Sequence, residues 1–149
     1  MISYRTITQS TLLAAAVTLG GCAWMQSMTG SDAVSMKNSL TGAQEVPAVT
    51  TGGSGTVETT FDKSTNVLTW SVAYSGLSGP VTAGHIHGPA PAGTNAGVLI
   101  PFTGDLSSPI KGKATLTAAQ VADLTAGRLY VNLHTAKNPG GEIRGQLTK

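Results

Sequence analysis

Residues 67–74 read Val67-Leu68-Thr69-Trp70-Ser71-Val72-Ala73-Tyr74. Large apolar side chains occupy every second position of this stretch, from Leu68 to Tyr74, and Thr69 and Ser71 fall between them. Successive side chains of a β-strand point to opposite faces. The alternation therefore predicts a strand that buries one face in a core. An alternating stretch at residues 56–61 precedes it across a polar turn, so the two predict a hairpin.

Similar short stretches recur along the chain, separated by turns rich in glycine, proline and asparagine. Many short strands with such turns predict an all-β antiparallel sandwich or barrel. One short helix interrupts them near residues 118–126, where Thr117 and Gln120 form a capping-box pattern and Gly127 suits the C-terminal end. We expect strands at residues 36–40, 56–61, 67–74, 81–87, 98–102, 110–116, 128–134 and 143–147.

The first 21 residues have the features of a secretory signal: one charge, Arg5, and an apolar run over residues 12–19 that is too short to span a bilayer. The following Leu19-Gly20-Gly21-Cys22 resembles the lipobox of bacterial lipoproteins. That resemblance implies cleavage before Cys22 and acylation of this residue, with two or three acyl chains giving a stable membrane anchor. An ordinary secretory signal with an incidental cysteine is the alternative.

This interpretation divides the chain into three parts: a signal peptide at residues 1–21, a flexible stalk at residues 22–35 and one domain at residues 36–149. Ala23 follows the cysteine in place of the aspartate associated with retention in the inner membrane. We therefore expect a lipid-anchored protein of the cell envelope, on the outer membrane and facing the periplasm or the exterior.

Composition excludes several classes of function. Cys22 is the single cysteine, so the domain has no disulfide framework, zinc–thiolate site or cysteine nucleophile. The net charge is +2 and the basic residues are scattered, which excludes a nucleic-acid partner. No serine or threonine lies in a nucleophile elbow, and no glycine loop has the phosphate-binding pattern. We expect no enzymatic activity.

The three histidines of the chain lie in two strand-like stretches. His85 and His87 are two residues apart, so they share a face of one predicted strand, and His134 lies on another. Three neutral imidazoles without a thiolate suit Cu(II), Zn(II) or Ni(II), and copper is favoured by intrinsic affinity. The sequence thus predicts a metal site, copper or zinc, provided that the two strands lie side by side.

Three polar residues near His134 are candidates for supporting this site. Asn132 shares the face of His134, and Glu142 and Arg144 share a face of the last predicted strand. A carboxylate that accepts a hydrogen bond from a ligating imidazole would fix its tautomer. Two alternatives remain: the histidines are part of a structural hydrogen-bond network, or the domain and its loop at residues 88–97 bind another envelope protein or a glycan.

Four blocks of the sequence carry a resemblance to a known family. The blocks are Leu40-Thr41-Gly42-Ala43-Gln44-Glu45-Val46-Pro47, Gly84-His85-Ile86-His87-Gly88, Tyr130-Val131-Asn132-Leu133-His134-Thr135 and Asn138-Pro139-Gly140-Gly141-Glu142-Ile143-Arg144-Gly145-Gln146-Leu147. Together they resemble the chordin-type (CHRD) domain family. The resemblance covers residues 36–148 and implies an immunoglobulin-like β-sandwich or barrel. The growth-factor antagonism of animal chordins is not carried over, because the cysteine-rich modules that accompany the domain there are missing.

Overall fold

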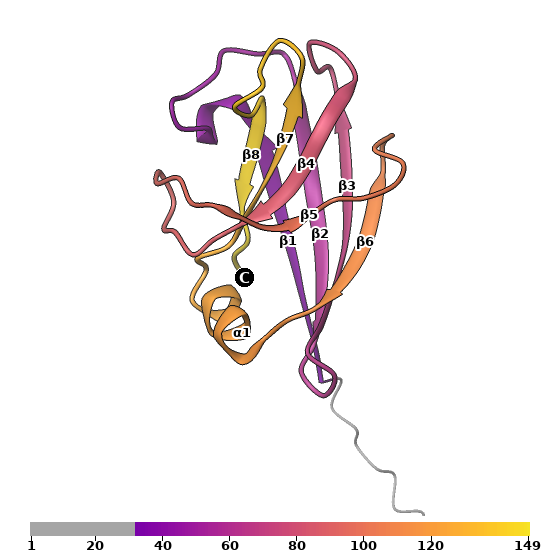
Figure 1. Cartoon of the computed structure of the whole chain (residues 1–149), viewed down its shortest axis with the longest axis vertical. Helices are drawn as coiled ribbons and strands as arrows, with labels where there is room; N and C mark the ends of the chain where they lie inside the picture. The colour runs from indigo at the N-terminus through magenta and orange to yellow at the C-terminus, as the bar shows by residue number, and fades with distance from the viewer. Residues whose placement is uncertain (1–31) are drawn as a thin grey trace, which may run out of the picture.

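The structure is a computed structural model that describes residues 32–149. These residues form eight strands of one antiparallel sheet, a 3-10 turn and one α-helix (Figure 1). In chain order the elements are β1 (Ala33–Thr41), η1 (Gly42–Gln44), β2 (Ser54–Asp62), β3 (Val67–Ser75), β4 (Val81–His87), β5 (Val98–Pro101), β6 (Ile110–Thr115), α1 (Ala118–Thr125), β7 (Tyr130–Thr135) and β8 (Ile143–Gln146).

The sheet curls until its two edges approach each other, which makes a nearly closed barrel. Its strand order is β5-β4-β7-β8-β1-β2-β3-β6, so β5 and β6 are the edges. Residues of both edge strands, Pro101 and Gly112 among them, line one small cavity. Beside it the ring of Phe102 stacks on Trp70 of β3, with 5.2 Å between ring centroids. The all-β fold with one short helix is therefore confirmed.

The alternation in the sequence correctly identifies the core face. Leu68, Trp70 and Val72 are buried on β3, and Val57 and Phe61 are buried on the paired β2. Tyr74 lies at the margin of this core, half-buried, with its hydroxyl donating to the Leu106 carbonyl. On each strand with alternating apolar residues, every second side chain thus points into the barrel and contributes to its core.

β7 departs from the alternating pattern because both of its faces are buried. Val131 and Leu133 point into the core, as the sequence predicts, yet Tyr130, Asn132 and His134 are also at most 9% exposed. The strand lies between β4 and β8, and loops cover its second face. That second face carries the buried polar side chains of Asn132 and His134.

The domain begins earlier than the sequence predicts. Ala33 already pairs with Asp62, so residues 33–35 belong to β1 and not to a stalk. The reason is that β2 extends to Asp62 and offers these residues a full set of strand partners. Residues 22–31 of the expected stalk, Cys22 among them, and the expected signal peptide lie outside the described residues. Within residues 32–149, no helix is both long enough and apolar enough to cross a membrane.

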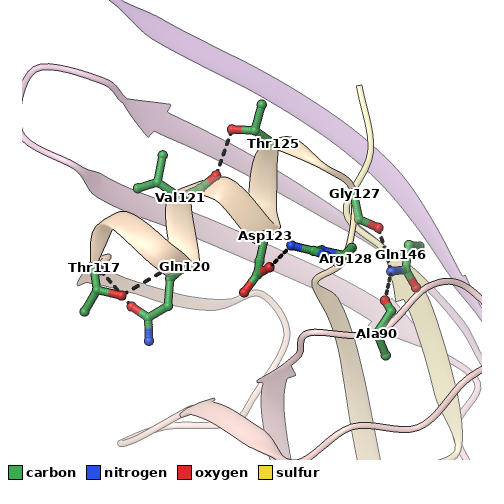
Figure 2. Close-up of polar contacts among 9 residues, drawn as sticks. All are labelled: Ala90, Thr117, Gln120, Val121, Asp123, Thr125, Gly127, Arg128 and Gln146. Atoms are coloured by element: carbon green, nitrogen blue, oxygen red, sulfur yellow. Dashed lines mark hydrogen bonds and ion pairs between the residues drawn. The ribbon is translucent and has the colours of Figure 1, made fainter.

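The helix α1 has the capping box that the sequence predicts (Figure 2). The Thr117 hydroxyl accepts from the Gln120 amide, and the Gln120 side chain accepts from the Thr117 amide. At the other end Gly127 adopts a left-handed conformation with φ of 67°. An ion pair between Arg128 and Asp123 closes the last turn.

Removing the cap should cost a measurable part of the stability. We expect Thr117→Ala to lower the free energy of unfolding by about 1 kcal/mol, because the Gln120 amide loses its acceptor. Thr117→Ser keeps a hydroxyl and should stay within a few tenths of a kcal/mol of the wild type. Urea unfolding followed by circular dichroism measures both, and equal stability of all three proteins would contradict the prediction.

Candidate metal centre

The three histidines meet on the outer face of the β4–β7 pair. His85 lies opposite Asn132 in the antiparallel register, and His87 lies opposite Tyr130. His134 is two residues beyond Asn132 and therefore projects from the same face. One ring nitrogen from each of the three histidines lies within 4.8 Å of the others. The condition set by the sequence, adjacency of the two strands, is met.

Backbone carbonyls fix the orientation of two of the rings. The Nδ1 of His87 donates to the Ala96 carbonyl at 3.0 Å, and the Nδ1 of His134 donates to the Pro139 carbonyl at 2.9 Å. With the Nδ1 protons used in this way, each Nε2 presents a lone pair. This is the arrangement that holds a ligating imidazole in one tautomer.

One of these Nε2 atoms lacks any hydrogen bond. The Nε2 of His87 has no hydrogen-bond partner. The residue is only 7% exposed, so this atom is buried as well as unpaired. Buried polar atoms of folded proteins almost always have a partner. Among residues 32–149, five buried side-chain atoms have no partner, and this one belongs to a cluster of three histidines.

The surroundings of His85 and His134 favour the neutral form of these two rings, which is the form that binds a metal. Burial lowers the pKa of His85, and the neighbouring His134 and His87 lower it further. Burial also lowers the pKa of His134, against the opposing effect of its hydrogen bond to Pro139. The Nδ1 of His85 lies 3.0 Å from the Nε2 of His134. Because the His134 proton is on Nδ1, His85 Nδ1 donates to His134 Nε2 in this hydrogen bond.

Arg144 supports the cluster through other residues. The His87 ring stacks on Tyr130 at 4.9 Å, and the buried Arg144 guanidinium lies 3.5 Å from the Tyr130 ring centroid. Arg144 also donates to the Thr94 carbonyl and to Asn95 Oδ1. It thereby holds the loop at residues 88–97, whose Ala96 carbonyl orients His87.

Glu142 does not have the role that the sequence suggested. Its carboxylate accepts from the Thr51, Ser78 and Thr135 hydroxyls and from the Ser78 amide. These four donors fill the four lone-pair directions of a carboxylate, so none is left for an imidazole. The error arose because Glu142 lies just before β8, where its side chain reaches the loops and not the histidines. It joins three loops at one end of the barrel.

Asn132 and Glu45 lie beside the cluster. Asn132 Oδ1 is 3.0 Å from the Nε2 of His134. Glu45, which the sequence analysis did not single out, is 6% exposed and has an unpaired Oε1. Burial raises the pKa of Glu45 to about 7, against the opposing effects of Arg144 and Asn132. Its place in the first of the four family blocks was the available signal.

A larger cavity of about 610 Å³ lies elsewhere, between α1 and the first two strands. Apolar side chains line most of it, including Met36, Phe61 and Leu124. No histidine borders it. The chemistry of the domain is therefore gathered on the β4–β7 face and not in this cavity.

Fold and site together define an antiparallel β-barrel domain with a buried histidine cluster on one face. The family model of the CHRD domain matches residues 36–147. The chain therefore belongs to the CHRD domain family, as its four sequence blocks indicated. A search of curated proteins gave no significant match, and neither did a search of solved structures.

The hydrogen bonds around Glu142 predict a specific sensitivity to acid. Burial alone would raise its pKa, but the bonds from Ser78, Thr135 and Thr51 outweigh burial and lower it to about 2. The unfolded chain, with the ordinary value near 4.5, binds more protons than the folded one between these limits. The stabilisation, about 3 kcal/mol, is thus present above pH 4.5 and lost as the pH falls towards 2.

We expect Glu142→Gln to lower the free energy of unfolding at pH 7 by about 2–3 kcal/mol and to flatten its decline between pH 4.5 and 2. Urea unfolding at several pH values measures both effects. The matched control is Glu58→Gln, which removes an exposed carboxylate paired with Lys37 and should keep the wild-type acid profile. A Glu142→Gln profile as steep as that of the wild type would show that this carboxylate is not the sensitive group.

Proposed function

We propose that this CHRD domain binds a divalent transition metal, copper or zinc, through His85, His87 and His134. The observation that carries the proposal is the buried Nε2 of His87, which has no hydrogen-bond partner. In a purely structural network that atom would have a donor, because an unpaired buried polar atom costs about 1–3 kcal/mol. A metal ion supplies the partner that the protein does not.

The chemistry of the donor set supports the same proposal. Three imidazole nitrogens lie within one ion's reach, two of them oriented by backbone carbonyls. Imidazole without thiolate suits divalent zinc, copper and nickel, and Cu(II) binds most tightly in the intrinsic order. The role that we propose is metal binding without catalysis.

Isothermal titration with Zn(II) and Cu(II) at pH 7 tests this proposal directly. The protein is produced from residue 23 onward without a histidine tag. We expect one ion per chain for the wild type and no stoichiometric binding for the His85→Ala/His87→Ala double variant, which removes two of three ligands.

Lys111→Ala, an exposed change on β6, is the control and should bind as the wild type does. Circular dichroism establishes that the double variant is folded. If the wild type binds neither ion, or if the double variant binds equally well, the histidines are structural. Binding of an envelope protein or glycan through the loop at residues 88–97 is then the function to test.

We further propose that Cys22 carries a lipid anchor that places the domain in the cell envelope, on the outer membrane and facing the periplasm or the exterior. The support is the sequence Leu19-Gly20-Gly21-Cys22 behind a short apolar run. An acylated cysteine followed by ten or so residues would leave the barrel, which begins at Ala33, close to the membrane surface.

Lipid labelling in a bacterial host tests the anchor. The full chain should incorporate radiolabelled palmitate and partition with membranes, whereas Cys22→Ser should do neither, because a hydroxyl does not accept the acyl transfer that builds the anchor. Both proteins should yield the same folded domain after protease release. If neither the full chain nor Cys22→Ser incorporates palmitate and both partition in the same way, the sequence is an ordinary secretory signal.

A further inference from the structure

His134 has an oxygen atom next to each of its ring nitrogens. The Pro139 carbonyl lies 2.9 Å from Nδ1, and Asn132 Oδ1 lies 3.0 Å from Nε2. A neutral imidazole carries a single N–H. Because a carbonyl oxygen only accepts, that proton belongs on Nδ1. The lone pairs of Nε2 and Asn132 Oδ1 then face each other at hydrogen-bond distance.

A doubly protonated His134 would donate to both oxygens, but such a ring has no lone pair left for a metal. A proton on Nε2 alone would leave the Pro139 carbonyl facing a lone pair instead. A change of tautomer in the neutral ring therefore moves the conflict from one nitrogen to the other without removing it.

The side-chain amide nitrogen of Asn132 lies on the side of Glu45. A methyl group placed on Gly141 would touch both Glu45 Oε1 and Asn132 Nδ2, so the amide nitrogen lies on the Glu45 side. The Asn132 amide is also among the groups that lower the pKa of Glu45. A rotation of 180° would turn the Asn132 oxygen towards that carboxyl group. The oxygen therefore faces the histidines.

We propose that Asn132 Oδ1 is the fourth ligand of the metal, completing a centre of three imidazole nitrogens and one amide oxygen. This inference rests on the proposed function. A cation between Nε2 and Oδ1 turns two opposed lone pairs into two metal bonds. His134 Nε2 lies 3.0 Å from both Asn132 Oδ1 and His85 Nδ1. Ligands of a tetrahedral ion with bonds of 2.0–2.1 Å are about 3.3 Å apart, which these two distances approach. The histidine nitrogens as a set lie within 4.8 Å of one another and would move closer together around the ion.

A fourth ligand from the protein determines what kind of centre this is. Catalytic zinc sites keep an open position for water or substrate, whereas closed four-coordinate sites hold the ion. Nitrogen and oxygen donors without sulfur also favour Zn(II), Co(II) and Cu(II) over Cu(I), which prefers thiolate and thioether. The centre selects a divalent ion and retains it.

Cobalt(II) absorption spectra together with Zn(II) affinities test the fourth ligand. Tetrahedral Co(II) absorbs visible light far more strongly than six-coordinate Co(II), so the spectrum reports on coordination and a merely structural role would not change it. We expect the wild type to give an intense tetrahedral spectrum. Asn132→Ala should lose intensity and bind Zn(II) at least about tenfold more weakly.

Two further variants control for misfolding and for the loss of any asparagine. Asn132→Asp keeps an oxygen at the same position and should retain the tetrahedral spectrum. Asn38→Ala, which removes an amide that contacts Thr148 on the other side of the sheet, should match the wild type. Circular dichroism of each variant establishes its fold before titration.

The outcomes separate this inference from the proposed function. Wild-type binding with unchanged spectra and affinity in folded Asn132→Ala would overturn the fourth ligand and leave the histidine site intact. Loss of binding in both Asn132→Ala and Asn132→Asp would overturn it too, because the oxygen would not be what matters. A wild type that binds neither Zn(II) nor Co(II) would overturn the proposed function and the inference together.

Discussion

The antiparallel pairing of β4 with β7 is the constraint on which the site depends. It places His85 opposite Asn132 and His87 opposite Tyr130, so that side chains more than 40 positions apart in the chain share one face. Cross-strand neighbours of this kind lie about 4.5–5.5 Å apart at Cβ. That spacing brings the imidazoles within reach of one ion without any contribution from a flexible loop. The strand pair therefore sets the positions of the three histidines relative to one another.

Loops and the neighbouring strand β8 then fix the orientation of the imidazole rings. The carbonyls of Ala96 and Pro139 each take a proton from a histidine and so direct an Nε2 lone pair inward. The loop that carries Ala96 is held in turn by Arg144, and Gln146 Nε2 donates to Ala90 O and Gly127 O (Figure 2). Two residues of β8 thus anchor this loop over the face of β4 and β7. A change in β8 is expected to reach the histidines through this loop.

The two buried carboxyl groups show how environment separates residues of the same type. Glu142 receives four hydrogen bonds, and its pKa falls to about 2. Glu45 is also buried but has an unpaired oxygen, and its pKa rises to about 7. The hydrogen bonds to Glu142 stabilise its charged form and at the same time join three loops. Glu45 lies beside the amide nitrogen of Asn132, whose oxygen is near His134.

Local patterns in the sequence predicted most of the elements, because alternation along a strand and a capping box depend on residues close in the chain. The Thr117 capping box and the buried face of β3 were read correctly in this way, as was the shared face of His85 and His87. The start of β1 at Ala33 was not predicted, because the first residues of β1 pair with the last residues of β2 and so depend on the length of β2. Partners far apart in the chain leave no such local signal.

The sequence by itself determined the all-β class, the histidines as the candidate ligands and the absence of thiolate chemistry in the domain. Only the tertiary structure decided that β4 and β7 are neighbours, that Glu142 turns to the loops, and that Glu45 and Asn132 flank His134. The physical reason is that ring orientation, burial and pKa are set by groups brought together across the sheet. Those groups are defined by strand order and loop path, which periodicity along one strand does not encode.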